Sequence, residues 1–238
     1  MNMKSETVEG LTRARAGNVA AELNHGPSGL RTAVFAALAL WLGLVICLGS
    51  QGAFVGRADS PPLPIFLGVA VPLAVFFAAY FSWGAFRSFI LSADLRLVAA
   101  IQAWRWAGLG FLNLYAFGIL PGPFAFPAGL GDMAIGFTAP WMVLELVRQP
   151  SFAASRRFRM WNILGIIDFV VAVTMGTLCS GFFHRFTELI GGVTTSPMAH
   201  LPLILIPAYM VPLFIMLHVT ALLQATHMAR KARNSTTD

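Results

Sequence analysis

The sequence predicts an all-α membrane protein, a bundle of six transmembrane helices with both termini on the cytoplasmic side. Three observations favour this fold class. Only 11% of the 238 residues are charged and 57% are hydrophobic, whereas a soluble domain carries about 25% charged residues. Six apolar runs are near or above the ~20 residues that a helix needs to cross a bilayer. The basic residues gather on alternate sides of these runs, as the positive-inside rule requires.

The six predicted spans lie between a polar N-terminal tail, residues 1–31, and a basic C-terminal tail, residues 225–238. The first apolar run is 24 residues long. The core of a signal peptide has about 7–15 residues, so an uncleaved anchor is expected. Turns and loops rich in Pro and Gly separate the later runs. The spans cover approximately residues 32–55, 65–86, 95–120, 127–147, 160–180 and 200–224.

The distribution of the basic residues predicts the orientation. With both termini inside, thirteen of the sixteen basic residues fall in inner segments; the outer loops hold Arg57 and Arg185, and Arg105 is intramembrane. This favours a multi-pass protein of the bacterial cytoplasmic membrane whose inner face meets anionic lipid headgroups. The net charge of +6 would suggest nucleic acid in a soluble protein. Here the basic residues lie at the ends of apolar runs, so no nucleic acid is expected.

Three charged residues lie inside predicted spans: Arg105, Asp132 and Asp168. Ionisable groups in hydrocarbon are costly and usually pair or line a polar path. At ~1.5 Å rise per residue, Arg105 lies roughly 15 Å and Asp168 roughly 12 Å from the inner edge, and Asp132 roughly 7–8 Å from the outer edge. The short turn between the third and fourth spans favours Asp132 as the partner of Arg105, with Asp168 further out. Gln102 and Asn113 extend the polar stripe of the third span.

Small residues accompany both aspartates at helical spacing, which lets membrane helices approach closely. The sequence therefore predicts a tight contact of three helices around the three charges. It leaves open whether the charges form a structural clamp, a polar pocket or a proton or ion path, or whether some of them reach water. The small residues are Ala128, Gly136 and Ala139 around Asp132, and Gly165, Ala172 and Gly176 around Asp168.

Histidines suggest a second kind of site. His200 and His218 are five helical turns apart and could each ligate a haem, although a second ligand is missing for each. A hydrogen-bonding or interfacial role is the better explanation for these two histidines. His184 and Glu188, at i,i+4 spacing, could bind a metal or act as acid and base together with His200. Solvated loop residues are the commoner explanation. The two cysteines do not have a metal-binding spacing, so we expect them to pack as small apolar side chains within the spans. No cofactor is expected.

The chain resembles a group of uncharacterised bacterial multi-pass integral membrane proteins. The resemblance rests on Gln102-x-x-Arg105, on Gly131-Asp132-x-x-x-Gly136-x-x-Ala139-Pro140, and on the prolines at 202, 207 and 212 followed by His218. It covers most of the chain from the third span onward and implies a location without an activity.

Three functions stay open from the sequence. The first is a small-molecule, ion or proton transporter or ligand-binding protein with an intramembrane Arg/Asp centre. The second is a structural or accessory membrane subunit, with membrane lipids and a further copy or a partner subunit as its contacts. The third is a membrane enzyme or redox protein that uses the outer-face histidines.

Overall fold

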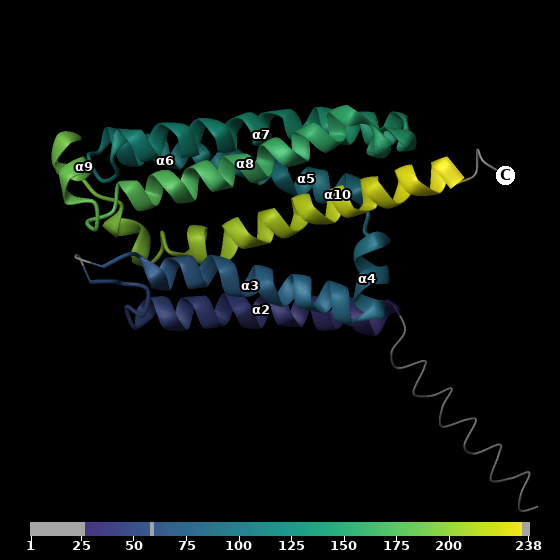
Figure 1. Cartoon of the computed structure of the whole chain (residues 1–238), viewed down its shortest axis with the longest axis horizontal. Helices are drawn as coiled ribbons and strands as arrows, with labels where there is room; N and C mark the ends of the chain where they lie inside the picture. Colours follow the sequence, from purple (N-terminus) through teal and green to yellow (C-terminus); the bar gives the residue numbers. More distant parts are fainter. Residues whose placement is uncertain (1–26, 58–59, 235–238) are drawn as a thin grey trace, which may run out of the picture. The chain divides into compact units, whose positions relative to one another are not determined.

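The computed structural model describes residues 27–57 and 60–234, and all regular structure in these ranges is helical (Figure 1). This confirms the all-α prediction. Five of the described helices are long and apolar enough to cross a membrane. The predicted N-terminal tail lies outside the described residues up to position 26. The five apolar helices cover Gly29–Ser50, Leu63–Ser82, Gly122–Arg148, Arg156–Leu178 and Ile206–Arg230.

The chain forms two compact units that divide within the first helix, α2 (Pro27–Ser50). The first unit ends at Leu42, and its described part is an apolar helix. The second unit begins at Gly43 and contains all the other helices. The features described below belong to the second unit.

The predicted second span is divided into two helices. α3 (Leu63–Ser82) stops because Trp83 adopts an extended conformation, with φ −118° and ψ 104°. α4 (Gly84–Leu91) then runs across the direction of α3 (Figure 1). The predicted span therefore ends at Ser82 rather than near residue 86.

The predicted third span, residues 95–120, is broken into three pieces. They are α5 (Leu95–Ile101), the 3₁₀ helix η1 (Gln102–Gly108) and α6 (Leu109–Ala116). The interruption lies where this segment meets the next helix at very short range. A Cβ atom built on Gly136 would stand 2.5 Å from the backbone nitrogen of Trp106. A 3₁₀ stretch within a helix often marks a functional or strained point, and η1 carries Arg105.

The predicted fourth span starts earlier than expected. α7 (Gly122–Arg148) begins at Gly122 and not at Pro127. Pro123 occupies its first turn, where a missing N–H costs little, and Pro127 is accommodated inside the helix. Asp132 therefore lies ten residues into α7, about 15 Å along its axis. Asp132 thus lies further from the start of its helix than the sequence predicts.

The last two predicted spans correspond to α8 (Arg156–Leu178) and α10 (Val211–Asn234), with the short 3₁₀ helix η2 (Pro150–Ala154) before α8. The chain between them contains α9 (His184–Leu189), the 3₁₀ helix η3 (Ser196–Ala199) and the π-helical turn η4 (Ile206–Met210). The apolar helix thus begins at Ile206, not at residue 200, and α10 continues through most of the predicted tail. We call the end of this unit that holds α9 and segment 54–57 the α9 end (Figure 1).

Candidate functional site

Arg105 joins four groups on three helices. Its Nε donates to Asp132 Oδ1 of α7 at 2.7 Å, and its Nη2 donates to Asp168 Oδ2 of α8. Its Nη1 bonds to the carbonyl oxygen of Gly165 at 3.3 Å and to His218 Nε2 of α10 at 2.9 Å. The guanidinium is nearly fully buried, with 1% of the side chain exposed. The contact between Arg105 and Asp132 was predicted; Asp168, expected further out, also bonds directly.

The hydrogen bonds fix the protonation and tautomer of His218. A guanidinium has only donors, so Nε2 of His218 must accept from Arg105, and the imidazole is neutral. Its Nδ1–H then donates to Asn162 Oδ1 at 2.9 Å. The amide of Asn162 is oriented in turn, because its Nδ2 donates to the Phe158 carbonyl at 2.8 Å. A chain of buried polar groups therefore orients the guanidinium. We call Arg105, Asp132, Asn162, Asp168 and His218 the polar centre.

Aromatic and glycine residues shape the space around the polar centre. The guanidinium carbon of Arg105 lies 4.0 Å from the ring centroid of Phe169, within range of a cation–π interaction. A Cβ atom on Gly131 would overlap the Asp168 carboxylate, and one on Gly165 would overlap the His218 ring. These two glycines leave the room that the charged and imidazole side chains occupy.

The other two residues of the polar stripe predicted on the third span, Gln102 and Asn113, lie in different environments. Gln102 is fully buried, and its amide has no hydrogen-bond partner among the described residues. Asn113 lies on the exposed side of α6, away from the polar centre. Sequence reasoning missed Asn162, and it considered His218 as a hydrogen-bonding residue or a haem ligand without connecting it to Arg105. The available signal was that each is a polar residue within an otherwise apolar span.

The metal and haem hypotheses do not match the geometry. Both ring nitrogens of His218 are already hydrogen-bonded within the polar centre, so His218 is not available to a haem. His184, Glu188 and His200 are exposed. Within residues 27–57 and 60–234, no group of three or more His, Cys, Asp or Glu is arranged to hold a metal ion.

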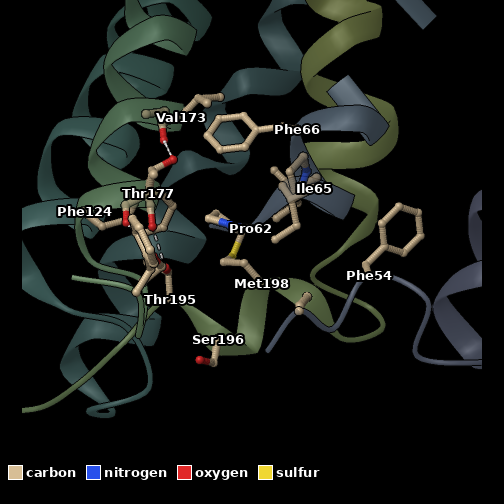
Figure 2. Close-up of a pocket in the computed structure, with 18 of the residues that line it drawn as sticks. Phe54, Pro62, Ile65, Phe66, Phe124, Val173, Thr177, Thr195, Ser196 and Met198 are labelled. Carbon is tan, nitrogen blue, oxygen red and sulfur yellow. Dashed lines mark hydrogen bonds between the residues drawn. The ribbon is translucent and has the colours of Figure 1, made fainter. Parts of the chain in front are cut away.

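A cavity of about 180 Å³ leads from the α9 end to Asp132. Its exposed mouth includes Arg57, Ser196 and His200. In Figure 2, Ile65 and Phe66 of α3 face Val173 and Thr177 of α8, and Met198 lies between them. Its walls are therefore mainly apolar, with hydroxyl groups near the mouth.

A second, smaller cavity of about 80 Å³ reaches Arg105 itself and shares Asp132, Phe111 and Phe169 with the first. Asp132 thus lies where the two cavities meet. Its side chain keeps 16% exposure, against 1% for Arg105. Within the described residues, Oδ1 of Asp132 accepts from Arg105 and Oδ2 has no protein donor. Asp132 is therefore the charged group of the polar centre that a molecule in the cavity can meet.

Comparisons with known proteins place this site within a shared domain. A family model described as a domain of unknown function, DUF8737, matches residues 62–226. No curated protein and no solved structure matches the chain. The matched range contains the whole polar centre and most of the residues that line the larger cavity.

The hydrogen bond from His218 to Asn162 gives a first prediction. Asn162→Leu leaves the buried Nδ1–H of His218 without an acceptor, and an unsatisfied buried donor costs about 1–3 kcal/mol. We expect a corresponding loss in the free energy of unfolding, measured by denaturant titration in detergent. Asn113→Leu, on the exposed side of α6, is the matched control and should change stability by less than about 0.5 kcal/mol. Equal effects of the two substitutions would contradict the role given to Asn162.

Proposed function

We propose that this chain, which belongs to the DUF8737 family, is a six-span membrane protein that binds a small molecule or ion at its polar centre, in transport or as a ligand-binding protein. One observation carries the proposal: the cavity from the α9 end stops at the Asp132 carboxylate, which Arg105 holds in place. Ligand sites are typically concave and largely apolar, with a few convergent polar groups.

The chemistry of the site agrees with this function. Charged groups at mid-membrane usually mark substrate, ion or proton paths. A structural clamp alone requires no cavity beside the charges. The broken third segment fits as well, because irregular backbone at membrane depth is tolerated where it is buried in protein or lines a cavity. Counting α5, η1 and α6 as one span gives six spans.

We further propose that both termini lie in the cytoplasm of a bacterial cell and that the α9 end faces outward. The positive-inside distribution of basic residues supports this orientation. The cavity then opens to the outside, and its ligand enters from that side.

Cysteine labelling tests the orientation. In a background without Cys47 and Cys179, a cysteine at Pro61 should react with a membrane-impermeant thiol reagent added to intact cells. A cysteine at Ser151 should react only after permeabilisation. Both positions are exposed. The reverse pattern would overturn the orientation.

Ligand binding is tested by thermal shift of the purified chain against a small-molecule set of mixed charge. Ala172 lines the larger cavity, so Ala172→Trp should fill it and abolish any stabilisation by a ligand. Val170→Trp is the control, because Val170 is 58% exposed on the outer surface of α8. A ligand that stabilises the native chain and the Val170 variant, but not the Ala172 variant, supports the proposal. Equal stabilisation of all three would place the ligand elsewhere and refute it.

A further inference from the structure

We infer that the cavity takes a small organic cation and that its binding at Asp132 displaces one proton from the polar centre, so that the site holds either the proton or the cation. This inference rests on the proposed function and names its substrate class. It follows from the count of charges at the polar centre, from the donors of Arg105 and from the chemistry of the cavity walls.

The charges of the polar centre do not balance. Arg105 supplies one positive charge, and Asp132 and Asp168 supply two negative charges when both are ionised. His218 adds none, because it accepts a hydrogen bond from Arg105. One negative charge is then left over inside the bilayer, where an uncompensated charge is costly. The charge is neutralised by a proton on one carboxyl when the cavity holds no cation, and by the cation when it does.

The same geometry disfavours an anion. Four of the five N–H donors of Arg105 are used by Asp132, Asp168, Gly165 and His218. Its side chain is 1% exposed, so an anion in the cavity would meet the Asp132 carboxylate instead. That carboxylate offers Oδ2, an acceptor without a protein donor in the described residues, to a positively charged group.

The cavity walls suit the body of an organic cation. Phe111, Phe124 and Phe169 line the larger cavity together with Asp132, and aromatic faces attract cations. A cavity of about 150 Å³ is known to hold benzene. The larger cavity, at about 180 Å³, therefore has room for a body of about one aromatic ring, with an ammonium group directed at Asp132.

The exchange balances in protons and charge. The ammonium group enters from the mouth, the protonated carboxyl becomes a carboxylate that pairs with it, and the released proton leaves to water through the same cavity. Among the described residues, the charged or titratable groups that face this step are Arg105 of η1, Asp168 of α8 and His218 of α10. Arg57 and His200 line the mouth. The net charge of the polar centre together with any bound cation is zero before and after.

The test uses the purified full chain and three probes with the same ring and different charge: benzylammonium, benzyl alcohol and benzoate. Calorimetry near pH 7 in two buffers of different ionisation enthalpy measures affinity and proton release together. We expect benzylammonium to bind most tightly, with release of about one proton, and with an affinity that rises up to tenfold per pH unit while the proton competes. Benzoate should not bind.

Two substitutions locate the effect. Asp132→Asn removes the carboxylate that meets the cation while Arg105 keeps Asp168, so the variant should fold and lose both binding and proton release. Asp94→Asn is the matched control, because Asp94 lies outside the cavity with 48% of its side chain exposed. This control should bind benzylammonium as the native chain does, with the same proton release.

The outcomes separate this inference from the proposed function. If benzyl alcohol or benzoate binds as tightly as benzylammonium, or if benzylammonium binds without proton release, the inference is wrong and the ligand site stands. If no probe binds, the inference is also wrong. In the background without Cys47 and Cys179, reaction of an Ala172→Cys variant with a hydrophilic thiol reagent, with no reaction of Val170→Cys, would then leave the proposed cavity standing. No reaction of either variant would refute both.

Discussion

Arg105→Ala is expected to destabilise the protein by about 3–5 kcal/mol, the cost of breaking a buried ion pair by removing one partner. The loss belongs at the high end of this range, because Arg105 is hydrogen-bonded to both Asp132 and Asp168. Both carboxyls lose a hydrogen-bond donor, the ionised one also loses its counter-charge, and Nε2 of His218 loses its donor. The free energy of unfolding, measured by denaturant titration in detergent, gives the loss.

Arg96→Ala is the control for this result. Arg96 also pairs with an aspartate, Asp94, at 2.9 Å, but 59% of its side chain is exposed. Exposed ion pairs contribute little to stability, so this substitution should leave the unfolding transition almost unchanged. Similar losses for Arg96→Ala and Arg105→Ala would show that the buried ion pairs of the polar centre contribute no more to stability than an exposed ion pair does.

Gly108→Ala is expected to destabilise by about 1–3 kcal/mol, the usual cost of overpacking. A Cβ atom at this position would lie 2.6 Å from Asp132 Cβ and 2.7 Å from the carbonyl oxygen of Gly129. Neither atom is the far end of a flexible side chain, so η1 and α7 would have to separate and Arg105 would move away from Asp132. The same denaturant titration measures the loss.

The control for this substitution lies two residues further along the chain. A Cβ atom on Gly110, in α6, meets nothing within 4 Å. Alanine is the better helix former by about 0.5–1 kcal/mol, so Gly110→Ala should leave stability unchanged or raise it. A loss of the same size at both positions would mean that helix propensity, and not the close contact of η1 with α7, explains the result.

The sequence predicts those parts of the site in which a residue would be energetically unfavourable without a partner, because such residues stand out from the apolar segments around them. Arg105, Asp132 and Asp168 stand out because a charge in an apolar run needs a partner. The small residues around the two aspartates indicate close helices, and two of them, Gly136 and Gly165, do face another element at very short range. From these facts the contact between Arg105 and Asp132 follows.

The remaining parts depend on tertiary structure. The break at η1 lies where Gly136 brings α7 against the backbone of Trp106, a contact that the hydrophobic pattern of residues 95–120 does not reveal. The true start of α7 depends on Pro123 being tolerated in a first turn. Asn162 and His218 are 56 residues apart in the chain, so no local sequence pattern indicates the hydrogen bond between them. The cavity is lined by residues from separate segments between positions 54 and 211, so it forms only in the folded chain.

Coupling between Arg105 and Asp132 tests the central claim most directly. In a double-mutant cycle, Arg105→Ala is combined with Asp132→Asn, and the free energy of unfolding is measured for the native chain, both single variants and the double variant. The double variant should lose less free energy of unfolding than the sum of the two single losses, because the second change removes a carboxylate that Arg105→Ala leaves unpaired. We expect a coupling energy within the range of about 0.5–3 kcal/mol for interacting residues. Simple addition of the two losses would mean that the charges act independently and that the polar centre is not a single unit.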